Sequence, residues 1–442
     1  VSIISLDASH IHVVAPGVAG SNTAGVGIAA VENEINRSFE AVLFDSNITA
    51  GRDVLVDVTS RGSQRALAVS GALSGSVSAA GSSSNNHVCQ ETLASVDGES
   101  VVSAGNDIAI RSSVFEDIDT DVISIAGSGG FSVAGAVAHS HVDTHTHSRV
   151  GTGANVSAQG NVSIESCDDT TVDSIVGEAG LGINAGGIGA GVGVIHIHKD
   201  VQAYVDEGAN VYAAAANPGV LQSYSGEHDV NGNFLLEEIR GIEVQATSNE
   251  HVNNMTIGVN GGLGFGVAAA VGMTVVEPNV EAWIGRLATV DADSGGTPSP
   301  EGDKSPTNVN VSAVNQSNFG DRILGAGIGG LGAAGAASIG MVNHFVSAHI
   351  DSDADVDALY DIDVQGLSQK QIDSQAVGIG LGLFGVDGSA SVWHLGSEYN
   401  AEFILGGATL NALEFGGVSV VQSVNTVIDF VDHRLHDWFG LG

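Results

Sequence analysis

The chain has 442 residues and a formal net charge of −38, from 51 acidic and 13 basic side chains. This balance excludes nucleic acid as a partner, because a protein that binds a phosphate backbone needs clustered lysine and arginine. Aromatic residues make up only 5% of the chain, whereas glycine alone contributes 62 residues. Small and β-branched apolar residues favour strands and frequent glycine disfavours helices, so the composition predicts a β protein.

A spaced pattern recurs along the chain: an apolar residue, a second apolar residue six positions later, and an alanine two positions after that. The seven copies begin at Val42, Val96, Val150, Val205, Ile284, Ile350 and Ile404. The steps between them are 54, 54, 55, 79, 66 and 54 residues. Repetition at a nearly fixed period predicts one supersecondary unit per copy, with neighbouring units packed against one another.

Each copy is followed by two apolar residues that flank one other residue, such as Val54 and Val56. A turn that contains glycine, asparagine or aspartate often precedes the pair, as at residues 51–53, 105–107 and 160–161. Period-two alternation bounded by such turns is typical of strands.

Apolar runs rich in glycine and alanine complete the unit. They cover residues 177–194, 257–275, 323–342 and 377–392. The run 323–342 has twenty residues and no charge, which is the length of a transmembrane helix. Seven of these residues are glycine, however, and each costs a helix about 1 kcal/mol relative to alanine. We therefore predict strands in these runs and no transmembrane segment.

These patterns predict an all-β fold, a parallel β-solenoid (β-helix) of about seven repeats of roughly 54 residues, over residues 1–420. We expect wide, flat coils with strands rich in glycine and alanine. Two longer steps place insertions at about 214–240 and 293–307, at the same point of the unit, where loops project from one edge. The stretch 421–442 departs from the repeat, and is either a C-terminal cap or the start of a further repeat.

Histidines form the first candidate site. His87, His141 and His196 each lie nine residues before the first marker of their unit. Equivalent residues of adjacent units would stack about 4.8 Å apart, and neutral imidazoles at that spacing can share Zn, Cu or Ni. The alternative is that they are polar residues of a turn on a solvated edge.

Acidic residues at alternate positions form the second candidate. The two sets, which we place in turns, are Asp117, Asp119 and Asp121, and Asp351, Asp353 and Asp355. Carboxylates spaced in this way can ligate Ca²⁺ through hard oxygens, although neither set matches an EF-hand loop. Solvated turn residues are the alternative. Ca²⁺ is the one cofactor that this pattern suggests.

Catalytic and disulfide motifs are missing from the sequence. There is no Gly-x-Ser-x-Gly elbow, no P-loop and no His-Glu-x-x-His, so we predict that the chain is not an enzyme. The two cysteines, Cys89 and Cys167, exclude a disulfide-rich scaffold, and they are either isolated thiols or a single bridge.

The glycine-rich run AGLGINAGGIGAGVGV, followed by AYVDEGANVYA and preceded by GNVSIES, resembles repeats of large secreted bacterial adhesins. These are the haemagglutinin-like and leukotoxin-like exoproteins, and the resemblance covers nearly the whole chain. It implies secretion, an elongated β-helical stalk, and a role in adhesion or assembly at the cell surface.

The sequence thus predicts an extracellular structural or adhesive repeat protein that forms a rigid rod or filament. We expect self-association into a filament or sheet, stabilisation by calcium, and cell-surface glycans as partners. The alternative is a β-helical carbohydrate-binding protein or polysaccharide-degrading enzyme, with its site on the edge that carries the two insertions. A histidine edge that stores metal is a third hypothesis.

Overall fold

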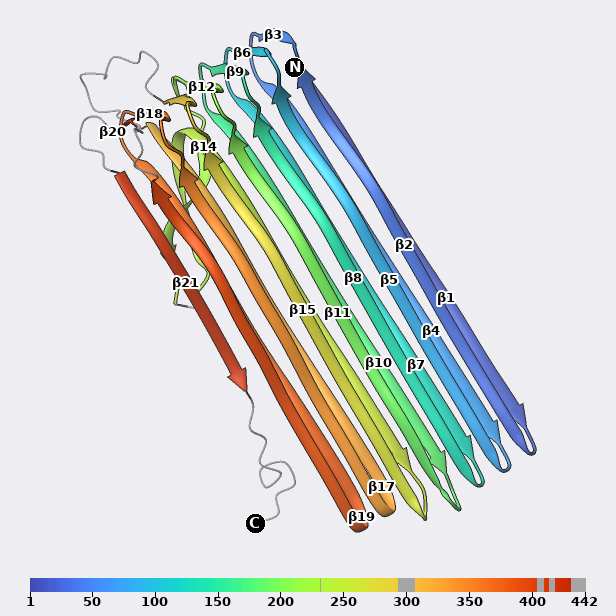
Figure 1. The fold of residues 1–442 in the computed structure, drawn as a ribbon. Coiled ribbons are helices and arrows are strands. Elements are labelled where there is room, and N and C mark those ends of the chain that lie inside the picture. Colours follow the sequence, from blue (N-terminus) through green and yellow to red (C-terminus); the bar gives the residue numbers. More distant parts are fainter. Residues whose placement is uncertain (231, 293–306, 404–408, 413–417, 431–442) are drawn as a thin grey trace.

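The computed structural model describes the chain except for residue 231 and residues 293–306, 404–408, 413–417 and 431–442. Every regular element of the described residues is a strand. The long strands run side by side as a slab, with tight turns at one end and short strands at the other (Figure 1).

Three kinds of strand make up the chain. The long strands are β1 (Ser2–Ser21), β2 (Ala24–Phe44), β4 (Val54–Ser74), β5 (Val77–Asp97), β7 (Ile108–Ser128), β8 (Phe131–Val150), β10 (Val162–Gly182), β11 (Gly186–Val205), β14 (Phe234–Gly261), β15 (Phe265–Ile284), β17 (Thr307–Ile350), β19 (Ile362–Phe403) and β21 (Val418–Phe430). The short strands are β3 (Asn47–Ala50), β6 (Val101–Ala104), β9 (Asn155–Ala158), β12 (Asn210–Ala213), β16 (Thr289–Asp291), β18 (Asp355–Ala358) and β20 (Thr409–Ala412). A separate strand, β13 (Leu221–His228), lies within the first predicted insertion.

The repeat markers of the sequence pair with one another. Ile48 of β3 lies opposite Val102 of β6, and Val102 lies opposite Val156 of β9, in parallel register. Seven short strands continue this ladder as a separate sheet. The long strands of successive units are likewise parallel, with Val54 opposite Ile108. The predicted strands and their parallel pairing therefore agree with the structure.

The predicted β-solenoid of wide flat coils is wrong. Instead of separate faces wound from successive coils, the long strands form one sheet, in the order β1-β4-β7-β10-β14-β17-β15-β11-β8-β5-β2. The reason is β17, whose first half pairs with β14 and whose second half pairs with β15, without a break. The sheet thus turns back through the glycine-rich middle of β17, and nearly closes on itself where β1 and β2 face each other (Figure 1).

The structure describes the two predicted insertions and the C-terminal stretch to different extents. In the first insertion, β13 pairs in antiparallel fashion with the start of β14, with Leu221 opposite Ile239 and His228 opposite Phe234. Phe234 and Tyr224 of this hairpin pack on Val314 and Leu367 of the main sheet. The second insertion lies almost wholly within residues 293–306, outside the described residues. Strand β21 continues the parallel pairing to Phe430, and residues 431–442 are not described.

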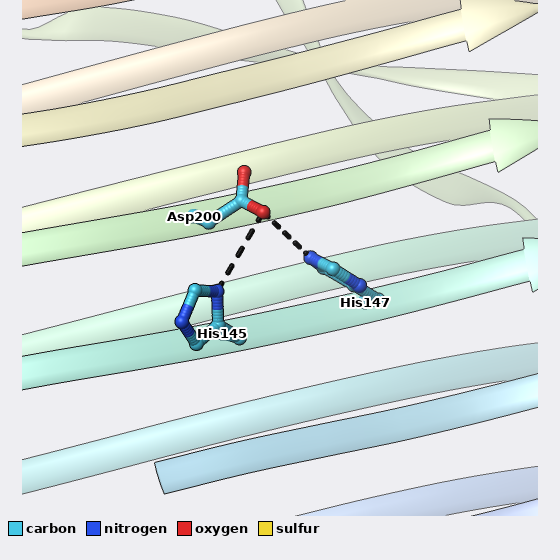
Figure 2. Close-up of side chains that lie close together, drawn as sticks. All are labelled: His145, His147 and Asp200. Atoms are coloured by element: carbon cyan, nitrogen blue, oxygen red, sulfur yellow. Dashed lines mark hydrogen bonds and ion pairs between the residues drawn. The ribbon is translucent and has the colours of Figure 1, made fainter. Parts of the chain in front are cut away.

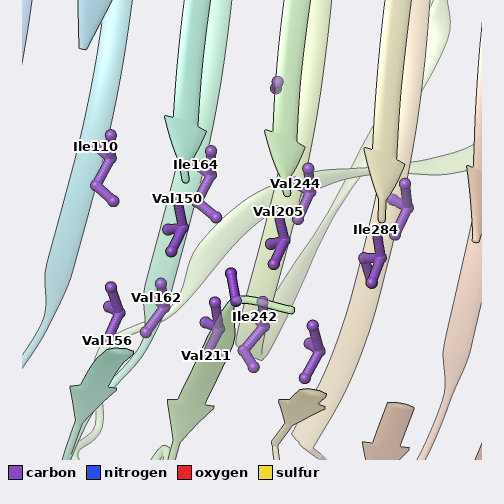
Figure 3. Packing of buried hydrophobic residues seen from close by; sticks show 14 of the residues in the cluster. Ile110, Val150, Val156, Val162, Ile164, Val205, Val211, Ile242, Val244 and Ile284 are labelled. Atoms are coloured by element: carbon purple, nitrogen blue, oxygen red, sulfur yellow. The ribbon is translucent and has the colours of Figure 1, made fainter. Parts of the chain in front are cut away.

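The main aliphatic core lies where the long strands meet the short ones. Inward-facing valine and isoleucine of each unit fill this space, including Ile164, Val211 and Ile284, which are fully buried (Figure 3). After its first three residues, which are all buried, β10 alternates between buried and more exposed positions, because successive side chains of a strand point to opposite faces.

The opposite end of the slab has no room for such side chains. A Cβ built on Gly187 of β11 would overlap the carbonyl oxygen of Gly180 on β10, and one on Gly27 of β2 would overlap the oxygen of Gly71 on β4. The two faces of the folded sheet are therefore in backbone contact near the tight turns. This contact explains why the apolar runs are so rich in glycine. Among the described residues there is also no helix that combines the length and apolarity needed to span a bilayer.

Glu178 makes the stability of this glycine-rich end depend on pH. Its side chain points inward from β10 and is 3% exposed, and Asn260 Nδ2 donates a 2.7 Å hydrogen bond to it. Burial raises the pKa of Glu178 from 4.5 to about 7, although the hydrogen bond from Asn260 opposes the shift. Between these values the unfolded chain has released a proton that the folded protein keeps, so stability falls as pH rises.

We expect the free energy of unfolding to be higher at pH 5 than at pH 8, and Glu178→Gln to reduce that difference by about 2 kcal/mol. Urea unfolding followed by circular dichroism at both pH values measures it. Glu34→Gln, on the exposed face of β2, is the matched control and should leave the difference unchanged. An equal effect of the two substitutions would contradict the assignment.

Candidate metal site

One outer surface of the sheet is rich in histidine. It is formed by outward-facing residues of β5, β8 and β11, which are consecutive neighbours in the sheet. We call it the histidine face, and it consists of His87, His139, His141, His145, His147, His196 and His198. These histidines occupy alternate positions within strands, so the alternative interpretation of His87, His141 and His196 as residues of a turn is wrong.

The three predicted histidines lie side by side across these strands. His87 is opposite His141, and His141 is opposite His196. Both pairs of ring centroids are 4.9 Å apart, with interplanar angles of 11° and 57°. The Nδ1 atoms of His141 and His196 lie 3.2 Å apart. Burial, together with the imidazoles of His196 and His87, lowers the pKa of His141. The row ends on β15, where Val275 is opposite His196.

A second group on this face brings three ligand atoms together. His145 and His147 of β8 and Asp200 of β11 each place one ligand atom within 4.8 Å of the other two. His147 Nε2 is 3.1 Å from Asp200 Oδ2, and His145 Nδ1 is 3.7 Å from the same oxygen (Figure 2). In the part of the chain that the structure describes, no other three His, Cys, Asp or Glu residues meet in this way.

Neighbouring side chains orient these three ligands. Asn279 Nδ2 and Gln202 Nε2 donate hydrogen bonds of 2.8 and 2.9 Å to Asp200 Oδ1, which leaves Oδ2 for the histidines. Asp143 Oδ1 lies 3.7 Å from Nε2 of His145, the ring nitrogen that faces away from Asp200. Burial alone would raise the pKa of Asp200, but hydrogen bonds from His147, Asn279 and Gln202 lower it, so the carboxylate is ionised.

The first predicted acidic set is not a turn. Asp117, Asp119 and Asp121 lie within β7 and point outward at alternate positions. Asp119 forms an ion pair of 3.2 Å with Arg65 of β4. Burial, with the charge of Asp119, raises the pKa of Asp121. The ligand atoms of these three described residues do not converge, so they do not form a three-ligand group.

The second predicted acidic set does lie at a turn. Asp351 and Asp353 are in the turn after β17, and Asp355 begins β18. Asp353 has a φ of 60°, a left-handed conformation that aspartate tolerates better than most residues. Asp351 Oδ1 lies 3.8 Å from His349 Nε2. These three aspartates do not bring their carboxylates together either.

A buried ion cluster was missed by the sequence analysis. Lys199 of β11 is fully buried, and its Nζ lies 2.8 Å from Asp168 Oδ1 of β10 and 3.3 Å from Glu250 Oε1 of β14. A pattern in the sequence predicts that Lys199 of this cluster is buried. His196 and His198 point outward, so the alternation of a strand places Lys199 inside. Asp168 likewise occupies an inward position, on β10.

A polar cleft of about 300 Å³ lies on the other outer face, next to the hairpin of β13 and β14. Its walls are mostly amides from aligned positions of neighbouring strands. They comprise Asp169, Asn233, Asn249, Glu250, His251, Gln316, Ser317, Asn318, Gln369 and Gln371. None of these residues is phenylalanine, tyrosine or tryptophan.

The two cysteines are free thiols. Cys89 lies on β5 and Cys167 on β10, which belong to opposite stretches of the sheet order. Burial, with the charges of Asp168 and Asp169, raises the pKa of Cys167 to about 12, so its thiol is protonated and unreactive at neutral pH.

Comparison with known proteins identifies no relative. No family model matches the chain, and neither the curated proteins nor the solved structures include one that is significantly similar to it.

Proposed function

We propose that this chain is a structural or adhesive repeat segment of a secreted bacterial surface protein, and that it associates with other copies through the open edges of its sheet. The observation that supports this proposal most directly is the in-register parallel ladder of units. Most long strands, such as β4 with β7 and β5 with β8, pair along some twenty residues with their neighbours, so the slab is stiff. A stiff, acidic, repetitive slab suits a mechanical role better than a catalytic one.

The edges of the sheet support self-association. The sheet order ends at β1 and β2, and each of these strands has a parallel neighbour on one side only. An unpaired strand of this length presents a row of free amide and carbonyl groups that another strand can join. The net charge of −38 opposes the approach of two copies, and divalent cations would screen that repulsion. Calcium is therefore proposed to favour assembly by screening, without a dedicated ligand set.

Electron cryomicroscopy of the purified protein, with calcium and with a chelator, tests this proposal. We expect ordered filaments or sheets in calcium, and fewer of them after chelation.

Val1 O accepts from Leu55 N of β4, so even-numbered residues of β1 direct their amides to the open edge. His12→Pro removes one such donor and should reduce assembly, whereas His12→Ala should not. Monomers under every condition would overturn the proposal.

The polar cleft favours a second candidate function, which is glycan binding. Its amides offer both donors and acceptors to sugar hydroxyls, and it adjoins the hairpin formed by the first insertion. Because its walls contain no phenylalanine, tyrosine or tryptophan, hydrogen bonds would contribute most of the binding of a sugar. A glycan array followed by calorimetry tests this function. Asn318→Ala and Gln371→Ala should weaken binding, and Asn36→Ala on β2 should not. An array without any bound glycan would exclude it.

A further inference from the structure

We infer that His145, His147 and Asp200 form a binding site for a divalent transition metal ion of the zinc class, with three protein ligands and one position open to solvent. This inference does not depend on the proposed structural function. It concerns a different group of histidines from the stacked row of His87, His141 and His196.

The separations of the ligand atoms fit such an ion. Zinc binds imidazole nitrogen at about 2.0–2.1 Å and carboxylate oxygen at about 2.0–2.2 Å, so the ligands of a tetrahedral site stand roughly 3.4 Å apart. Asp200 Oδ2 lies 3.1 Å from His147 Nε2 and 3.7 Å from His145 Nδ1, on either side of that value, and the three ligand atoms all lie within 4.8 Å of one another. Small rotations of side chains on a rigid sheet would complete the site.

The surroundings of the three ligands resemble the outer shell of a metal site. Asn279 and Gln202 hold the carboxylate of Asp200 by its other oxygen. Asp143 lies beside the far ring nitrogen of His145, where it would fix the tautomer and raise the basicity of the ligand nitrogen. These partners come from β8, β11 and β15, so the geometry is supported by three neighbouring strands.

The donor set selects the class of ion. Two imidazoles and one carboxylate suit Zn²⁺, Ni²⁺, Cu²⁺ or Fe²⁺, whereas Ca²⁺ and Mg²⁺ prefer oxygen ligands alone. The side chains of His145, His147 and Asp200 are 40%, 25% and 20% exposed, so an ion can enter from solvent. The strongly negative protein also raises the local concentration of cations.

The row of His87, His141 and His196 lacks this arrangement. Its rings stack face to face or tilted, and its nearest carboxylate oxygen, on Glu277, is 3.7 Å from His196 Nε2. No three of its ligand atoms converge. It therefore provides an internal comparison, with the same residue type on the same face of the same strands.

Titration of the metal-free protein with ZnCl₂, by calorimetry and by elemental analysis after gel filtration, tests the inference. We expect one saturable Zn²⁺ per chain, and CaCl₂ should not displace it. His147→Ala and Asp200→Asn should each weaken Zn²⁺ binding at least tenfold, and Asn279→Ala should weaken it about tenfold. Circular dichroism of each variant confirms that the sheet is intact.

Two controls separate this site from other histidines. His251→Ala removes a histidine of the opposite face, and His141→Ala removes the centre of the stacked row. Neither should change the affinity for Zn²⁺. The inference is overturned if the protein binds no Zn²⁺ at one equivalent, if His147→Ala binds it as tightly as the unaltered protein, or if His141→Ala alone abolishes binding.

Discussion

Replacement of Lys199 by methionine is expected to lower the free energy of unfolding by about 3–5 kcal/mol. The substitution keeps most of the volume of the side chain but leaves Asp168 and Glu250 as two fully buried carboxylates without a cation. Removing one partner of a buried ion pair is costly because the remaining charge is uncompensated in a medium of low dielectric constant.

The contacts of the cluster explain why Lys199 is charged inside the protein. Burial alone would lower its pKa, but Asp168 and Glu250 raise it by charge and by hydrogen bonding. Its Nζ also donates to the backbone carbonyls of Asp168 and Asn249, at 3.1 and 2.9 Å. Four acceptors from β10 and β14 thus surround one ammonium group of β11, and the cluster ties the two faces of the folded sheet together.

Hydrogen exchange and urea unfolding would measure the effect. The loss of protection should be largest in β10, β11 and β14, since repeat architectures respond locally. The triple variant Lys199→Met, Asp168→Asn, Glu250→Gln removes all three charges and should recover most of the lost stability. If Lys199→Met alone is as stable as the unaltered protein, the cluster does not hold the faces together.

A Gly187→Ala substitution is expected to destabilise the protein by about 2–3 kcal/mol, although it adds a single methyl group. The new Cβ would overlap the carbonyl oxygen of Gly180, which belongs to the opposite face of the sheet, and it would lie 3.0 Å from the carbonyl oxygen of Gly261. Backbone atoms cannot rotate away as the end of a side chain can, so the two faces must separate.

Gly81→Ala is the matched control. Gly81 also lies in a long strand, β5, but nothing is within 4 Å of a Cβ built at this position. Its substitution should be neutral, or stabilising by about 0.4–1 kcal/mol, because alanine reduces the entropy of the unfolded chain. Thermal unfolding of both variants measures the difference. Equal melting temperatures would show that the faces are not in backbone contact near the turns.

Much of the local structure could be predicted from the sequence. The spacing of Val42, Ile48 and Ala50 and its later copies predicted repeat units that pair in parallel, and Ile48 does lie opposite Val102. Period-two alternation predicted strands, because the side chains of a strand alternate between two environments. The equal offset of His87, His141 and His196 predicted their neighbouring positions, since residues at the same place in successive units meet across a parallel ladder.

Other predictions were wrong for identifiable reasons. Asp117, Asp119 and Asp121 were assigned to a turn because acidic residues often form turns, but their alternation with Ile118 and other buried residues belongs to a strand. The same alternation, followed from His196 to Lys199, would have placed a lysine inside the protein. The many acidic residues and histidines in these segments suggested solvated turns. Their alternation with apolar residues at every second position indicated instead strands with one buried face.

By itself, the sequence determined the strands, the length of the unit and the register of its markers. Only the tertiary structure decided that the strands form one sheet that turns back through β17, because either arrangement satisfies the same local pattern. The tertiary structure also decided which polar side chains come close enough to bind one metal ion. His147 and Asp200 are 53 residues apart and lie diagonally across two strands, so their contact depends on side-chain direction, and no spacing along the chain expresses it.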